Sequence, residues 1–115
     1  MLKPTRRHFA LGAAAALALP ATAWSQAYPN KPVRMLVGFA PGGPTDILAR
    51  IVAVSLGRSL GQSVVVDNRA GAGGAIAAQA LAKADPDGYT LLFAGDGQLT
   101  LLPQLNPRAG YESLR

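Results

Sequence analysis

The sequence predicts an α/β fold in which a β-α-β-α-β run forms a parallel sheet, and three patterns support this prediction. Three short apolar runs rich in β-branched residues alternate with two longer runs of helical periodicity. Each connection between strands is long enough to contain a helix, and a glycine-bearing loop follows each strand. Strands joined in this way lie parallel, with right-handed crossovers and helices on the faces of the sheet.

The first strand is predicted over residues 33–39, a short and mostly apolar run. The lead-in before it, residues 28–32, contains two prolines, and each proline disfavours helix in the residue that precedes it. The Pro-Gly-Gly-Pro run at residues 41–44 ends the strand and places a loop before the first helix.

The first helix is predicted to begin at Thr45 or Asp46, either of which can cap a helix N-terminus, and to end near Leu60. Gly61 then stands at the usual C-cap position. Apolar residues recur at helical spacing, which predicts a sheet-facing side, and two arginines are left to face water. The apolar positions are Ile47, Leu48, Ile51, Val52, Val54, Ser55 and Leu56, and the arginines are Arg50 and Arg58.

The remaining elements continue the same alternation along the chain. They are a second buried strand at 64–68, a glycine-rich turn at 71–74, an alanine-rich helix at 75–84, a turn at 85–88, a third strand at 90–95, a loop at 96–98 and a short helix near 99–105. All three strand-end loops therefore gather at one edge of the sheet. Open parallel sheets bind their ligands at this edge.

Residues 1–27 have the composition of an export signal, which is removed from the mature protein. A basic start precedes a mild apolar run at 10–19, and small residues offer cleavage after Ala27 or Ala23. The apolar run is shorter than the ~20 residues that span a bilayer, although an N-terminal anchor is the alternative. The Thr-Arg-Arg-His-Phe sequence at 5–9 favours the twin-arginine export machinery over the general secretory route. The expected location is the periplasm of a two-membrane cell.

Composition argues against several classes of function. The export signal takes Lys3, Arg6 and Arg7 from the chain's eleven basic residues, so eight remain against six acidic residues, a net charge of +2. Without a basic run, this charge gives no support for nucleic-acid binding. The chain has no cysteine, and its single histidine, His8, lies in the export signal. Neither a cofactor, nor a metal site, nor an enzymatic activity is therefore predicted.

The loop after the first strand has the composition of an anion-binding loop. Its glycines let a ligand approach the backbone, and the free N–H groups at the start of the following helix favour a carboxylate or phosphate. Asp46 has two interpretations, as a helix cap or as a partner of a ligand group or bound water. The alternative for the whole loop is an ordinary turn between a strand and a helix.

The Gly-x-Gly-Gly sequence at 71–74 is a second candidate loop. It lacks the spacing of a dinucleotide-binding fingerprint, so nucleotide binding is not predicted. Arg69 just before it has two interpretations, as a partner of a ligand carboxylate or as a structural partner of Asp67 or Asp46. A carboxylate pair of Asp46 and Asp96 for acid–base catalysis has no histidine, metal motif or nucleophile to support it.

Several separated motifs resemble one family, and they occur here in the family's order. They are Tyr-Pro-x-Lys-Pro-Val-Arg from residue 28, Val-x-Phe-x-Pro-Gly-Gly-x-Thr-Asp-x-x-Ala-Arg from 37, Leu-Gly-Gln-x-Val-Val-Val-x-Asn-Arg-x-Gly-Ala-Gly-Gly from 60, and Ala-x-Pro-Asp-Gly-Tyr-Thr-Leu-Leu from 84. Residues 28–95 thus resemble the Bug family, the periplasmic substrate-binding receptors of the tripartite tricarboxylate transporter system.

The resemblance implies a two-domain α/β binding protein of the type II periplasmic class, whose lobes close on the ligand. It implies that residues 28–115 are the N-terminal part of solute-binding domain 1, that the ligand is a small carboxylate, and that membrane transporter subunits are partners. Ligand-binding positions implied by the family are Phe39, Ala40, Pro41, Gly42, Gly43, Thr45 and Asp46 in the first loop, Gly71, Ala72 and Gly74 in the second, and Gly95, Asp96 and Gly97 after the third strand.

Three features depart from the family pattern, and one of them is Leu102-Pro103, which replaces an Asn-Pro of the family. The family usually has a small hydroxyl residue just after the third strand, where this chain has Asp96, whose carboxylate would repel an anionic ligand. Members are also longer than this chain, which ends at Arg115, so a truncated first lobe is expected. A nonfunctional remnant of such a receptor is the leading alternative, and a secreted enzyme is less favoured.

Overall fold

The structure, a computed structural model, describes residues 27–112 and has the predicted α/β architecture. The predicted export signal, apart from Ala27, lies outside the described residues. The elements in chain order are β1 (Val33–Val37), α2 (Pro44–Leu60), β2 (Val64–Asn68), the 3-10 turn η1 (Ala72–Gly74), α3 (Ala75–Ala82), β3 (Thr90–Phe93), the π-helical turn η2 (Gly97–Leu101) and α4 (Leu102–Leu105).

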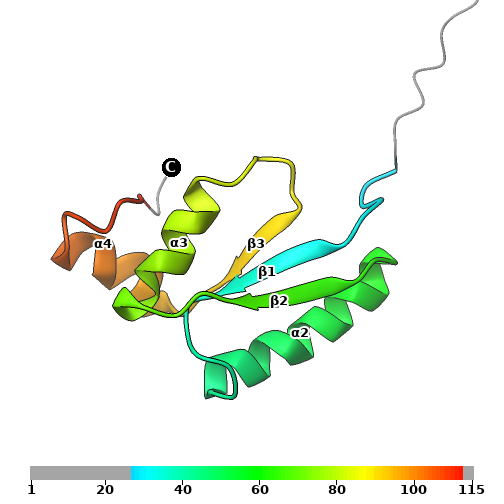
Figure 1. The fold of residues 1–115 in the computed structure, drawn as a ribbon, viewed down its shortest axis with the longest axis horizontal. Helices are drawn as coiled ribbons and strands as arrows, with labels where there is room; N and C mark the ends of the chain where they lie inside the picture. Colours follow the sequence, from blue (N-terminus) through cyan, green and yellow to red (C-terminus); the bar gives the residue numbers. More distant parts are fainter. Residues whose placement is uncertain (1–26, 113–115) are drawn as a thin grey trace, which may run out of the picture.

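The three strands form one parallel sheet, as predicted, and their order in the sheet is β2-β1-β3. Val33 of the central strand lies opposite Val64 of β2, and Val37 lies opposite Phe93 of β3. The first crossover runs outward from β1 to β2, and the second passes back over β1 to reach β3. As right-handed crossovers, they place α2 and α3 on opposite faces of the sheet (Figure 1).

The main core lies between α2 and the sheet. Met35 and Val37 of β1 pack there with Ala49 and Ala53 of α2, and these four residues are buried. Partly buried side chains complete this core, namely Leu56, Val64, Val66 and Phe93. The small alanine side chains let the helix backbone approach the strands closely, so β-branched and aromatic residues of the sheet fill most of the space.

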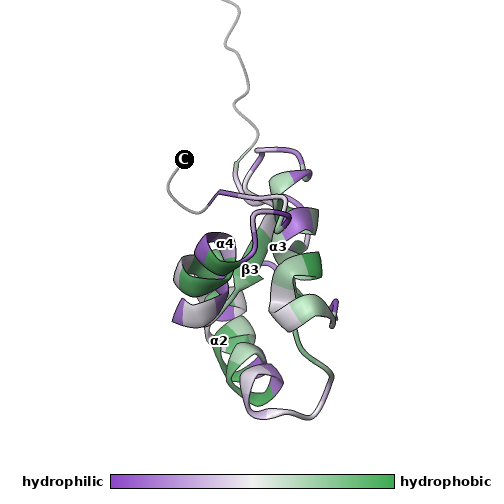
Figure 2. Ribbon diagram, turned by 90° about the vertical axis from the view of Figure 1, so that its left-hand side faces the viewer, coloured by the Kyte–Doolittle hydropathy of each residue, from purple (hydrophilic) through white to green (hydrophobic). Residues whose placement is uncertain are grey.

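The predicted sheet-facing side of α2 was largely wrong. Of the predicted apolar positions, Leu56 packs on the core, whereas the large side chains of Ile47, Leu48, Ile51, Val52 and Val54 are exposed. Hydrophobic residues run along much of α2 and are not confined to its sheet side (Figure 2). The spacing of apolar residues alone could not show which of them face the sheet. Alanine is less hydrophobic than isoleucine, but its small side chain fits the narrow gap between the helix and the sheet.

Several predicted boundaries shift by two residues. β1 ends at Val37 rather than at residue 39, and β3 ends at Phe93 rather than at residue 95. α3 ends at Ala82 rather than at residue 84. The predicted loop at 96–98 is wrong, because helical structure already begins at Gly97. In contrast, the bounds of β2 and the end of α2 at Leu60, followed by Gly61 with a left-handed φ of 67°, are confirmed. The predicted burial of β2 is wrong, because Val65 is exposed and the other residues of the strand are only partly buried.

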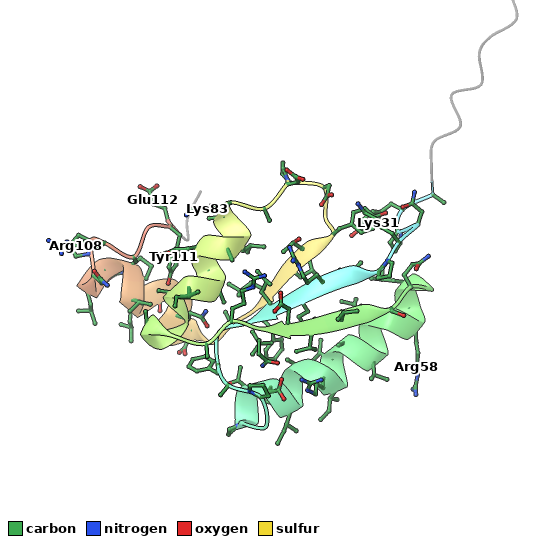
Figure 3. The ribbon with its side chains drawn as sticks, in the orientation of Figure 1. Lys31, Arg58, Lys83, Arg108, Tyr111 and Glu112 are labelled. Carbon is green, nitrogen blue, oxygen red and sulfur yellow. The ribbon has the colours of Figure 1, made fainter. Side chains whose placement is uncertain are left out.

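The lead-in to β1 is fixed at the far end of the sheet from the strand-end loops. The Tyr28 hydroxyl donates to the Gly88 carbonyl over 2.6 Å, and the rings of Tyr28 and Tyr89 meet edge to face with centroids 5.0 Å apart. Lys31, labelled in Figure 3, places its ammonium 4.4 Å from the Tyr89 ring centroid. No helix among the described residues has the length and apolar character needed to cross a membrane.

Candidate functional site

The three strand-end loops meet at the carboxyl edge of the sheet, as predicted. Gly38 after β1 lies so close to Gly74 that a Cβ on Gly38 would stand 2.7 Å from the Gly74 Cα. The same Cβ would stand 2.8 Å from Nε2 of Gln98, which follows β3. The loops after β1, β2 and β3 therefore form one cluster, and glycine is what permits their close approach.

Gln98 is the residue that ties this cluster together, and sequence reasoning missed it. Its side chain is buried and its Nε2 donates to the Gly74 carbonyl over 2.6 Å. Its own carbonyl accepts from the hydroxyl of Tyr111, and burial raises the pKa of that hydroxyl. Its Oε1 is buried without a hydrogen-bond partner among the described residues. A glutamine is usually exposed, so the sequence carried no signal for this role.

Gly74→Ala is expected to destabilise the loop cluster. Gly74 has φ +94°, and an added Cβ would meet the Gln98 Cδ at 2.4 Å. A left-handed residue with a Cβ costs roughly 1–2 kcal/mol, and overpacking adds roughly 1–3 kcal/mol. Urea denaturation should show this loss. The control is Gly95→Ala, where φ is not positive and the space is open, and its effect should stay within about 0.5 kcal/mol. Equal effects of both substitutions would contradict the packing around Gln98.

Asp46 is the second organising residue, and it is 3% exposed. Its Oδ2 accepts from the Gly42 backbone N–H at 3.0 Å and from the Arg50 Nε at 2.9 Å. Its Oδ1 accepts from Asn68 Nδ2 at 2.9 Å, and that same amide donates to the Phe39 carbonyl at 3.0 Å. The carboxylate thus joins the first loop to α2 and to the end of β2.

The predicted N-cap at Thr45 or Asp46 is wrong. The N-cap is Gly43, no side chain caps α2, and Pro44 occupies the first helical position. Asp46, the third helical residue, reaches back to Gly42 in the preceding loop. Proline has no N–H group that needs a partner at the first helical position, so α2 can begin at Pro44 without a polar capping side chain. The helix therefore begins before the residues predicted to cap it.

Hydrogen bonds hold the pKa of Asp46 well below the usual aspartate range. The largest cause is the bond from Arg50, followed by those from the Gly42 N–H and from Asn68. The same ion pair raises the pKa of Arg50. Asp46 is therefore ionised at neutral pH, and its charge is matched locally by the guanidinium.

This depressed pKa predicts a loss of stability in acid. The folded state holds Asp46 ionised below the pKa of about 3.9 that an aspartate has in an unfolded chain. The stabilisation by ionised Asp46 is fully present above the pKa of the unfolded state. It is lost as the pH falls from that pKa toward the lower pKa of the folded state. Urea midpoints measured from pH 7 to pH 2 should fall in this acid window, and the fall should be smaller in Asp46→Asn. An equal fall in both proteins would refute the assignment.

The first turn of α2 retains hydrogen-bond donors. The backbone N–H groups of Thr45 and Asp46, and the Thr45 hydroxyl, have no hydrogen-bond partner within residues 27–112. The helix dipole adds a partial positive charge at this end. Because Arg50 balances the charge of Asp46, the site can still accept a carboxylate.

The structure places the family-implied positions at this edge with very different exposure. Exposed are Phe39, Ala40, Pro41, Gly42, Gly71, Ala72, Gly95 and Asp96; partly buried are Gly43, Thr45 and Gly97; buried are Asp46 and Gly74. Asp96 accepts the Gly97 N–H at 2.7 Å and so caps its own helix. Arg69 donates to Asp67 at 3.2 Å, which agrees with its structural interpretation.

The carboxyl edge is an open surface rather than a closed pocket. Three hollows in the described part of the chain lie away from this edge, beside α2 and under α3. The hollow under α3 is basic, being lined by Arg34, Arg69 and Lys83. Residues 27–112 contain no group of three or more metal-ligating side chains.

Comparison with known proteins gives consistent matches. Residues 48–115 match the sequence model of the family described as tripartite tricarboxylate transporter family receptor. BugT of Bordetella pertussis is 48% identical over 98 residues, covering 81% of this chain and 29% of BugT. A UPF0065 protein of Bordetella bronchiseptica is 47% identical over 98 residues, covering 85% of this chain and 29% of that protein.

Solved structures agree with the sequence matches. The periplasmic binding protein BugD superposes with a TM-score of 0.72 at 48% identity, covering 75% of this chain and 28% of BugD. MatC from Rhodopseudomonas palustris, solved with bound malate, superposes with a TM-score of 0.71 at 38% identity, covering 75% of this chain and 29% of MatC. The chain spans less than a third of the length of these relatives.

Proposed function

The chain belongs to the tripartite tricarboxylate transporter receptor family, and from this premise we propose that it binds a small carboxylate outside the cytoplasmic membrane. In this proposal residues 1–27 direct export and residues 28–115 are part of the first solute-binding domain. The membrane subunits of a tripartite transporter are the proposed partners of the whole receptor. The periplasmic setting of BugD supports the location, and the malate bound to MatC supports the ligand class.

One observation carries the proposal most directly. The unpaired N–H groups of Thr45 and Asp46 stand at the start of a 17-residue helix, on the edge where three strand-end loops converge. Such a helix start stabilises a carboxylate through directed hydrogen bonds and its dipole. The Asp96 carboxylate of the third loop accepts a hydrogen bond from the Gly97 N–H of its own helix.

The proposal is tested by calorimetric titration of the chain with malate and with its neutral diamide. Malate is expected to release or absorb heat and the diamide is not, because only the carboxylate carries the charge that the helix start recognises. Binding should be weak, since an open edge covers little of the ligand. Thr45→Val, which keeps the shape but removes the hydroxyl, should weaken binding more than Thr45→Ser. Equal heats from malate and the diamide would count against the proposal.

A further inference from the structure

The basic hollow under α3 gathers three cationic side chains from three separate segments of the chain. Its volume is about 430 Å³, and no carboxylate is among the residues that line it. Arg34 comes from the central strand β1, Arg69 follows β2, and Lys83 lies at the C-cap of α3. Figure 3 labels Lys83 at this end of the helix. The chain thus directs positive charge to one place on the side of the sheet that faces away from α2.

Strand alternation explains why the hollow lies on this side of the sheet. Met35 and Val37 pack toward α2, so Arg34 and Leu36 of the same strand face the other way. Leu36 is 1% exposed and forms an apolar floor. An electrostatic interaction above an apolar floor is screened less than one on a fully solvated surface.

One carboxylate, that of Asp67, stands beside the hollow and serves both arginines. Its Oδ2 lies 3.2 Å from Arg69 Nε and 3.9 Å from an Arg34 Nη atom. Within residues 27–112 the Nη groups of these arginines have no hydrogen-bond partner, and Lys83 has no ion pair. Three positive charges and one negative charge leave the hollow with a net charge of +2.

We propose that the basic hollow binds a phosphate dianion, as inorganic phosphate or as a phosphate monoester. A phosphate group supplies the opposite charge and three strong acceptor oxygens. One guanidinium fork is enough for a planar carboxylate, whereas donors from three segments suit the several oxygens of a tetrahedral anion. This inference rests on the charges of the hollow and does not depend on the proposed carboxylate site at the start of α2.

Asp67 gives the hollow a preorganised pair of arginines. Because one carboxylate oxygen attracts both guanidiniums, it limits the positions that these long side chains adopt before a ligand arrives. Their side chains are 50% and 45% exposed, so their free Nη groups remain accessible to an anion. Groups that are already in place lose less conformational entropy when a ligand binds.

The test is an NMR titration of the 115-residue chain with inorganic phosphate, above the second pKa of phosphate and at constant ionic strength. Saturable shifts are expected at the Nε–H groups of Arg34 and Arg69 and at the backbone N–H of Lys83, and chloride should not produce them. Phenyl phosphate separates the two sources of the ligand. Tighter binding than that of inorganic phosphate assigns the hollow to phosphate monoesters, and equal or weaker binding assigns it to the free ion.

Charge variants show whether the effect is local. Arg34→Gln and Arg69→Gln should each weaken phosphate binding by about tenfold, as expected for lost hydrogen bonds to a charged group. The matched control is Arg58→Gln, which removes the same charge from α2, where Arg58 projects away from the sheet (Figure 3). Its effect should stay below about twofold. Asp67→Asn should strengthen binding, because it removes the carboxylate that competes for both guanidiniums.

Three results would overturn the proposal in variants that keep the wild-type circular dichroism spectrum. They are shifts that do not saturate, equal effects of Arg34→Gln and Arg58→Gln, and displacement of phosphate by malate. The first two would mean that phosphate senses only the net charge of the chain, and the third would mean that both anions share one site. Loss of malate binding with phosphate binding intact would instead remove the carboxylate proposal alone.

Discussion

Asp46→Asn should destabilise the chain and disorder its first loop. The substitution removes the charge that receives hydrogen bonds from Gly42, Arg50 and Asn68. An asparagine side chain has only one acceptor oxygen, whereas both carboxylate oxygens of Asp46 accept hydrogen bonds. Its NH₂ group would therefore face at least one of these donors. A buried donor left without a partner is costly. The urea midpoint of unfolding should therefore fall clearly at pH 7.

The control for this prediction is Asp85→Asn. Asp85 is an exposed carboxylate in the turn before β3, and no hydrogen bond or ion pair joins it to another described residue. Its replacement should leave the urea midpoint nearly unchanged. If both variants lost the same stability, general charge balance rather than the Asp46 network would be responsible.

Leu36→Ala is expected to have the largest effect on the core, a loss of about 2–5 kcal/mol. Leu36 is 1% exposed on the central strand. Its neighbours Met35 and Val37 pack toward α2, so strand alternation turns Leu36 to the α3 side. Small domains have a net stability of roughly 5–15 kcal/mol, so this substitution should leave a substantial unfolded population. Chemical denaturation followed by circular dichroism measures the loss.

The matched control is Leu48→Ala on the exposed side of α2. Leu48 is exposed, and alanine is the best helix former, so stability should change by less than about 0.5 kcal/mol. A large loss for Leu48→Ala would contradict the exposed position of this side chain on α2.

Local sequence signals predicted the order and type of the main elements. β2 follows from the Val-Val-Val run, and the end of α2 follows from Gly61, whose φ of 67° suits glycine. Each of these signals acts within a few residues. Boundaries moved where contacts between distant residues determine the structure, as at Phe39, whose carbonyl accepts a hydrogen bond from the Asn68 side chain.

The candidate site was predictable in location but not in construction. Parallel topology brings the strand-end loops together, and this rests on chain order alone. The partnership of Asp46 with Asn68 joins residues 22 positions apart, and the bond from Gln98 to Gly74 joins residues 24 positions apart. No local pattern marks either pair. The buried amide of Gln98 opposes the usual preference of glutamine for the surface, so composition pointed away from it.

The most direct test of the carboxylate site is an amide NMR titration of the chain with malate. We predict that the largest shifts fall on the backbone N–H groups of Thr45 and Asp46, and that the neutral diamide leaves these signals in place. Little change is expected in the last two turns of α2. Shifts centred on Arg34, Arg69 and Lys83 would instead place the anion in the basic hollow under α3 and contradict a site at the start of α2.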